Sequence, residues 1–131
     1  MKKQYYISQN YKIIFTRIEI ADNFLTRFQG LMGKRKLDNG EGLLLLKCSA
    51  IHTCFMRFSI DVVYLDSCFQ VLGCETVKPW KMGSFIKGSC NILELPPGAG
   101  QQLKSGEAIV LTLRNIYNVT EEEGETNNAR K

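Results

Sequence analysis

The sequence lacks the features of an exported or membrane-spanning chain. Polar residues interrupt every apolar stretch that follows the basic start at Lys2 and Lys3, so this segment has no signal-peptide core. Leu43–Leu46 is among the longest unbroken apolar runs and is far shorter than the ~20 residues of a membrane-spanning helix. We therefore expect a cytoplasmic protein with no membrane partner.

Histidine and tryptophan each occur once, and no two cysteines form a Cys-x-x-Cys pair. An odd number of cysteines in a chain without an export signal favours reduced thiols over a disulfide framework. We interpret them as small buried apolar side chains, and we expect no cofactor. The five cysteines are Cys48, Cys54, Cys68, Cys74 and Cys90.

A strong excess of charge of one sign is also absent. The net charge is +4 and the pI is about 8.8, short of the clustered basic footprint of a nucleic-acid-binding domain. We therefore expect no nucleic-acid partner. The length of 131 residues suits one domain whose core needs neither metal nor disulfide, and we expect a monomer.

Short β-branched and aromatic segments separated by turns recur along the chain and predict a mainly β fold. One helix is expected from Asp22 to about Met32, where apolar residues recur at offsets of three and four before Gly33. This pattern predicts a small β-barrel or jelly-roll-like sandwich of six to eight strands with one short capping helix. The predicted strands are 11–20, 43–46, 60–66, 70–77, 91–95 and 108–113, with further β structure at 51–56.

The composition divides the chain into three parts. Residues 1–10 are predicted to be a flexible N-terminal arm, and residues 11–117 a single β domain. Residues 118–131 are poor in apolar side chains and include the acidic run Glu121–Glu123, so a disordered polar tail is expected there.

The densest chemistry lies between Cys48 and Asp66, and three interpretations of this segment stay open. In the first, Cys48, His52 and Cys54 bind a metal, since thiolate and imidazole suit zinc. The spacing Cys-x3-His-x-Cys is not that of a standard zinc knuckle, and our expectation is that no metal is bound.

The other two interpretations centre on His52. It could serve as the base of a nucleophilic Cys54 with Asp61 as the orienting acid, although no glycine-rich elbow follows to supply an oxyanion hole. Alternatively, His52, Arg57 and Asp61 orient a ligand or stabilise the fold, with Arg57 paired to Asp61 or Asp66.

Trp80 stands in a loop between Lys78 and Lys81. An exposed aromatic ring beside cations is suited to contacting a sugar, an anion or a partner protein. The alternative is a residue at the edge of the sheet that covers the barrel mouth.

Several ordered motifs resemble those of the family called domain of unknown function 192, which is widespread in bacteria and archaea. The chain has Ser59 where the family usually has proline, and Glu107 where it commonly has aspartate. The resemblance implies a compact β-barrel or jelly-roll-like domain and lends no catalytic residues. The motifs are Arg27–Gly33, Glu41–Leu45, Ile51–Asp66, Lys78–Trp80, Ile92–Gly98 and Leu103–Glu107.

These observations predict a small non-enzymatic binding domain that holds an unknown small molecule or protein partner at the barrel mouth. The alternative is a small hydrolase-like enzyme using His52 with Asp61 or Cys54. The predicted binding residues are His52, Met56, Arg57, Asp61, Trp80 and Glu94.

Overall fold

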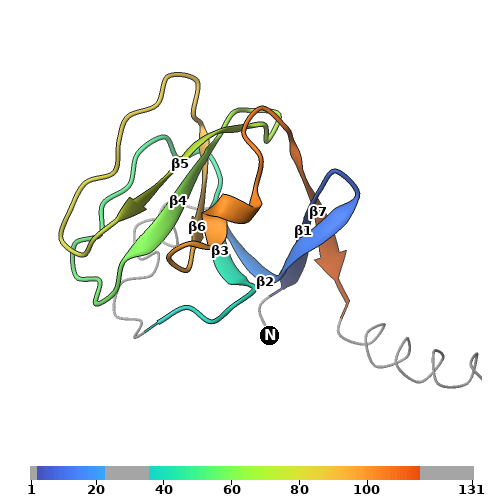
Figure 1. Ribbon diagram of the computed structural model, residues 1–131, viewed down its shortest axis with the longest axis horizontal. Coiled ribbons are helices and arrows are strands. Elements are labelled where there is room, and N and C mark those ends of the chain that lie inside the picture. Colours follow the sequence, from blue (N-terminus) through green and yellow to red (C-terminus); the bar gives the residue numbers. More distant parts are fainter. Residues whose placement is uncertain (1–2, 23–35, 116–131) are drawn as a thin grey trace, which may run out of the picture.

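The computed structural model describes residues 3–22 and 36–115, which form a seven-stranded sheet with very little helix (Figure 1). The prediction of a mainly β fold is confirmed. Within the described ranges the helical structure is a short 3-10 element, η1 (Ala99–Gln102). The strands are β1 (Gln4–Gln9), β2 (Lys12–Ala21), β3 (Glu41–Leu45), β4 (Ile60–Leu65), β5 (Val71–Val77), β6 (Asn91–Leu95) and β7 (Ile109–Arg114).

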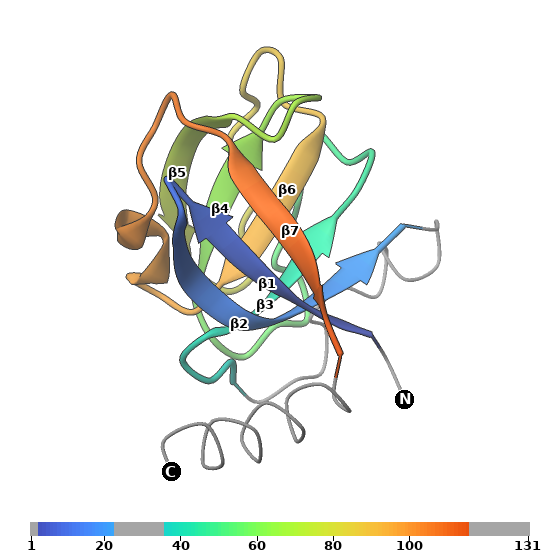
Figure 2. The ribbon, with the colours of Figure 1, turned by 90° about the vertical axis from the view of Figure 1, so that its right-hand side faces the viewer.

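The strands lie in the order β5-β4-β6-β3-β2-β1-β7, and every neighbouring pair is antiparallel except the parallel pair β2 and β3. The sheet curls strongly, which brings its edges β5 and β7 toward each other (Figure 2). An isolated bridge between Gln70 and Ala108, with the hydrogen bond from Ile109 N to Phe69 O, joins these edges. No continuous ladder closes the sheet within the described residues, so the predicted barrel is not confirmed.

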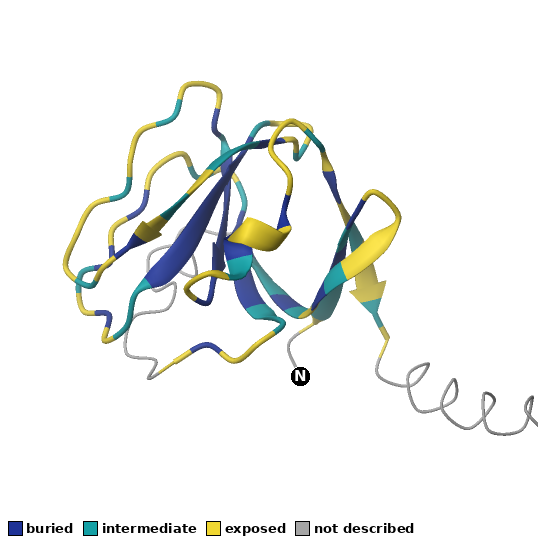
Figure 3. Cartoon of the chain, viewed as in Figure 1, coloured by how far each residue is buried: buried dark blue, intermediate teal, exposed yellow. Residues whose placement is uncertain are grey.

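Apolar side chains are buried on both faces of the central strands β4 and β6, which are dark blue along their length in Figure 3. Because side chains alternate along a strand, β4 sends Val63 into the concave side of the curl and Val62 to the opposite side. We call these groups the inner cluster, which includes Phe15 and Val63, and the outer cluster, which includes Ile51, Met56 and Val62.

Residues 4–9, which we expected to belong to a flexible arm, instead form β1 between β2 and β7. Ile7 is fully buried in the inner cluster. Gln9 is also buried, and its amide donates to Lys104 O (2.8 Å) and Glu107 O (3.1 Å) and accepts from Lys104 N (2.7 Å). These hydrogen bonds replace those that Gln9 would make with water, so the polar side chain is accommodated inside the fold.

The other predicted strands are observed, with ends shifted by no more than two residues. The exception is 51–56, where β structure is limited to an isolated bridge between His52 and Met82. η1 was not predicted. The predicted helix from Asp22 to Met32 and the tail 118–131 lie outside the described residues, apart from Asp22 itself.

Candidate functional site

Two long loops cover the outer cluster: residues 46–59 between β3 and β4, and residues 78–90 between β5 and β6 (Figure 1). We refer to them as the loop pair. They are hydrogen-bonded to each other through their backbones, with Thr53 N donating to Lys81 O (2.8 Å) and Trp80 N donating to Thr53 O (3.0 Å). The two loops therefore form one structural unit.

Thr53 lies at the centre of this unit and is fully buried. Its hydroxyl donates to Lys78 O (2.5 Å) and accepts from Lys81 N (2.9 Å). A buried hydroxyl with both functions satisfied restricts the groups around it, because breaking either bond would leave a polar atom without a partner. Thr53 thus fixes one loop against the other.

Phe55 and Trp80 flank Thr53 and form a ring pair at the surface. Their centroids lie 4.7 Å apart with an interplanar angle of 57°, and the two residues are 63% and 59% exposed. Both have left-handed backbone conformations, with φ of 66° and 62°. Such a conformation costs about 1–3 kcal/mol for a bulky residue. The fold therefore holds two large rings in solvent at the expense of local strain.

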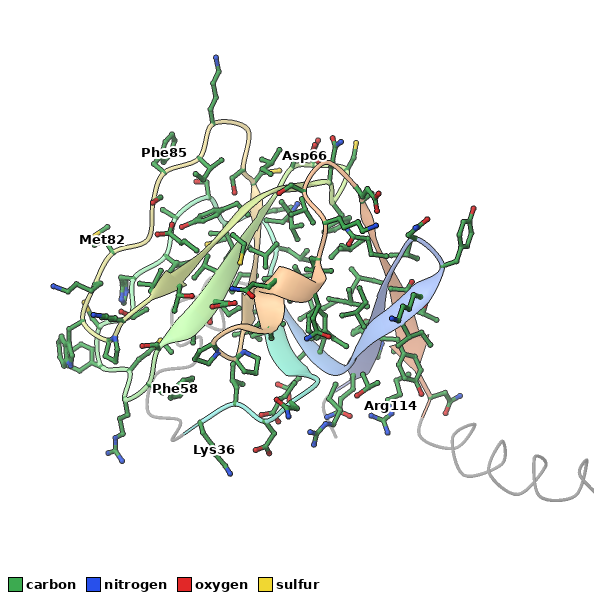
Figure 4. The ribbon with its side chains drawn as sticks, viewed as in Figure 1. Lys36, Phe58, Asp66, Met82, Phe85 and Arg114 are labelled. Atoms are coloured by element: carbon green, nitrogen blue, oxygen red, sulfur yellow. The ribbon has the colours of Figure 1, made fainter. Side chains whose placement is uncertain are left out.

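Met82 and Phe85 are two further exposed apolar residues on the same loop as Trp80. They are 75% and 78% exposed, and Figure 4 shows both side chains pointing outward from the loop. Met82 pairs with His52 in the isolated β-bridge, and His52 directly precedes Thr53 in the sequence. We call Phe55, Trp80, Met82 and Phe85 the aromatic surface.

The charge of the loop pair has one sign. Residues 46–59 and 78–90 contain no aspartate or glutamate. Their basic side chains are all exposed: Lys47, Arg57, Lys78, Lys81 and Lys87.

A polar contact from the sheet holds the second loop in place. The Tyr64 hydroxyl on β4 donates to Glu75 Oε2 (2.6 Å), and Ser84 N donates to the same oxygen (2.8 Å). Burial alone would raise the pKa of Glu75, but the hydrogen bonds from Tyr64 and Ser84 outweigh it and lower that pKa. Burial and the bond to Glu75 raise the pKa of Tyr64. Glu75 is therefore a carboxylate at neutral pH, and it connects β4, β5 and the loop.

Four of the predicted binding residues belong to the loop pair. His52, Arg57 and Trp80 are exposed, whereas Met56 is buried in the outer cluster beneath them. His52 Nδ1 accepts a hydrogen bond from Cys54 N (3.2 Å), which orients the ring relative to its own loop.

Asp61 is not brought to the loop pair. It is 1% exposed and pairs with Leu95, whose side chain belongs to the inner cluster on the opposite face of the sheet. Thr76 Oγ1 donates to Asp61 Oδ1 (2.6 Å) and Gly100 N donates to Oδ2 (2.9 Å). The predicted pairing of Arg57 with this carboxylate does not occur among the described residues.

Glu94 lies on the central strand β6, directly between Leu43 of β3 and Val62 of β4. It is 4% exposed, and its Oε2 has no hydrogen-bond partner among the described residues. Burial raises the pKa of Glu94 to about 8. At neutral pH this residue is therefore mainly a neutral acid beneath the loops, and it does not reach the exposed surface.

The cysteines differ from the sequence-based interpretation. All five are free thiols, but Cys68 and Cys74 are exposed and the other three are only partly buried. The interpretation as buried core residues is therefore wrong, because these residues lie in loops, in a turn or on the edge strand β5. Residues 3–22 and 36–115 contain no group of three or more His, Cys, Asp or Glu side chains placed to hold a metal.

Thr53, Phe55 and Phe85 were not predicted as site residues. One signal was available, since the lack of acidic residues in both long loops can be seen in the sequence alone. No helix in the described ranges has the length and hydropathy required to cross a membrane.

Comparison with known proteins gives consistent matches. The family model described as "DUF192: Uncharacterized ACR" matches residues 6–111. UPF0127 protein PH1112 of Pyrococcus horikoshii is 37% identical over 90 residues, covering 66% of this chain and 78% of that protein. UPF0127 protein TK1120 of Thermococcus kodakarensis is 31% identical over 100 residues, covering 73% of this chain and 64% of that protein.

Two crystal structures share the fold. A protein of unknown function from Novosphingobium aromaticivorans has a TM-score of 0.70 at 16% identity, covering 81% of this chain and 82% of that one. A candidate transcription regulator from Sinorhizobium meliloti has a TM-score of 0.69 at 18% identity, covering 85% and 94%. At these identities the likeness concerns the fold alone. The family match spans most of the described sheet and both loops, so this chain belongs to the DUF192 family, whose function is unknown.

Proposed function

We propose that this chain is a small non-enzymatic binding domain whose binding site is the aromatic surface of the loop pair. The observation that carries the proposal is the ring pair of Phe55 and Trp80, which is exposed, fixed by the buried Thr53 and held in a left-handed backbone conformation. Large rings in a preformed arrangement lose little freedom on binding, and tryptophan is enriched among the residues that dominate binding energies.

The predicted binding residues then have different roles. His52, Arg57 and Trp80 would contact the partner, and Met56 would support them from the outer cluster. Asp61 and Glu94 would affect the stability of the fold and not contact the partner, because both are buried away from the exposed rings. The mouth of a barrel-like sheet, where we first expected the site, is replaced in this proposal by the loops that cover the outer cluster.

The partner is a protein or a small molecule, and we propose that the domain acts as a monomer in the cytoplasm without nucleic-acid or membrane partners. The free thiols and the small net charge support this view. The fold likeness to a candidate transcription regulator does not decide the partner, since one fold serves many functions.

The test is a thermal-shift screen of metabolites and peptides, combined with the emission of Trp80, the only tryptophan. A ligand of this site raises the melting temperature by mass action and also shifts the Trp80 emission. We expect Phe55→Gly to abolish both responses and Ile13→Ser, which alters an exposed apolar residue on β2, to preserve them.

Two results would contradict the proposal. A ligand that stabilises the wild type and Phe55→Gly equally, without changing Trp80 emission, would place the site elsewhere. Chemical conversion of a bound ligand, lost in His52→Ala, would make the domain an enzyme.

A further inference from the structure

The loop pair combines exposed apolar side chains with positive charge, and it has no compensating acidic side chain of its own. Lys78 and Lys81 flank Trp80 in sequence, and Arg57 follows Phe55 by two positions. Glu75 on β5 precedes this loop, and its Oε2 accepts hydrogen bonds from Tyr64 and Ser84. No ion pair joins Arg57, Lys78 or Lys81 to another of the described residues, so their positive charge is available to an external anion.

We infer that the partner is an acidic protein segment that carries an aromatic or large aliphatic anchor residue; this inference rests on the proposed function. Such a segment places its anchor against Phe55 and Trp80 while its carboxylates face Lys78 and Lys81. Apolar contacts in the centre with complementary charges at the rim are the usual anatomy of a protein interface.

The geometry of the ring pair favours a protein segment over single-stranded nucleic acid. Single-stranded nucleic acid stacks its bases on open ring faces, whereas Phe55 and Trp80 cover part of each other at an angle of 57°. Two rings tilted against each other form a surface that a single anchor side chain can pack against.

Defined polymers test this inference without knowledge of the natural partner. The probes are a glutamate–tyrosine copolymer, polyglutamate and a lysine–tyrosine copolymer, each labelled for fluorescence anisotropy. We expect the glutamate–tyrosine copolymer to bind and to shift Trp80 emission. Polyglutamate should bind roughly tenfold more weakly because it has no anchor, equivalent to about 1.4 kcal/mol. The lysine–tyrosine copolymer should not bind.

Charge variants distinguish the effect of Lys78 and Lys81 on binding from the effect of the net charge of the protein. The double variant Lys78→Glu with Lys81→Glu should weaken binding of the glutamate–tyrosine copolymer by roughly tenfold or more and reduce its salt dependence. The matched control, Lys12→Glu with Lys104→Glu, makes the same change in net charge at exposed positions outside the loop pair and should bind like the wild type.

Each outcome has a defined meaning. Equal binding by the wild type and the Lys78→Glu, Lys81→Glu variant overturns the acidic partner, as does equal weakening in the control. If no copolymer binds but a screened ligand shifts Trp80 emission in a Phe55-dependent way, the acidic partner is wrong and the proposed function stands. Tighter Phe55-dependent binding to oligo-dT, or to phosphatidylcholine–phosphatidylserine vesicles, overturns the choice of a protein segment.

Discussion

Each face of the central strands holds a buried carboxyl group, and the two groups differ in their hydrogen bonding. On the inner face, Asp61 accepts hydrogen bonds from Thr76 and from the backbone of Gly100. On the outer face, Glu94 has an oxygen without a partner among the described residues and lies among apolar side chains. The carboxylate on the inner face thus joins β4, β5 and η1, while Glu94 Oε2 on the outer face has no such bond to the residues that the structure describes.

This difference separates the scaffold from the proposed site. The inner cluster lies within the curl of the sheet, where each polar group described above is satisfied. The outer cluster is covered by loops that contain strained rings and that are joined to β4 by few polar contacts, among them the Tyr64–Glu75 pair and the bond from Cys90 N to Leu65 O. We expect changes on the inner face to alter stability, and changes in the loop pair to alter binding with small effects on stability.

The largest expected effect comes from ionising Glu94. Its pKa is raised from 4.5 to about 8 in the folded chain, so the folded state retains a proton that the unfolded state releases. Stability should therefore fall as the pH rises from 4.5 to about 8, by up to ~1.4 kcal/mol per pH unit. By urea unfolding, Glu94→Gln should be as stable as the wild type near pH 4.5 and more stable than the wild type near pH 8. An identical pH dependence in both proteins would show that Glu94 has a partner in solution.

The second prediction compares Asp61 with Asp66. Asp61→Ala leaves the buried backbone N–H of Gly100 without its acceptor and removes the hydrogen bond from the Thr76 hydroxyl, and it should destabilise the fold by ~2–4 kcal/mol. Asp66 also accepts two hydrogen bonds, from Cys68 N and Gln70 N, but it is only partly buried in a turn. Asp66→Ala should therefore lower stability by only ~1 kcal/mol in the same denaturant titration. Equal losses would mean that burial does not distinguish the two carboxylates.

The third prediction concerns the contact that holds the 78–90 loop. Tyr64→Phe removes a hydrogen bond to an ionised acceptor and should reduce stability by ~1 kcal/mol at neutral pH. Because the Glu75 pKa is lowered, this contribution is present above the unfolded pKa and is lost as the pH falls through the folded one. The loss should therefore disappear in acid, whereas Tyr11→Phe, at a fully exposed hydroxyl, should have no effect at any pH.

Faster amide exchange in the second loop is the structural signature of the same change. Gly83 and Ser84 should exchange more rapidly in Tyr64→Phe, because the loop loses part of its attachment to β4. Unchanged exchange would show that the remaining hydrogen bonds of the loop, such as Gly83 N to Ile51 O, hold it without the Tyr64 contact.

Strand positions could be predicted where β-branched and aromatic residues are concentrated and a turn follows. The segment 60–66 was predicted on this basis and forms β4, which is buried on both faces. β1 was predicted to belong to a flexible arm, whereas the carbonyls of Lys104 and Glu107 satisfy the buried Gln9 amide internally. Such compensation depends on contacts between residues far apart in the chain, and no local pattern records it.

The site was predictable in part. Residue type and loop position pointed to His52, Arg57 and Trp80, all of which lie in the loop pair. Strand alternation already placed Asp61 on the same face as Val63, but it could not tell which face the loops would cover. Phe55 was missed because an aromatic residue is usually buried, and its exposure here follows from a left-handed backbone conformation that the sequence does not reveal.

The smallest expected effect on stability is that of Phe55→Gly, and it is the sharpest test of the difference between the two regions. Glycine adopts φ near 66° without steric strain, a gain of ~1 kcal/mol, while losing the ring contact with Trp80 removes ~0.5–1.5 kcal/mol. Added backbone freedom in the unfolded chain disfavours folding by a further ~0.5–1 kcal/mol. The net change in unfolding free energy should stay within ~1.5 kcal/mol, with binding through the ring pair abolished. A loss above ~3 kcal/mol would show that Phe55 is a core residue, and the loop pair would then belong to the scaffold.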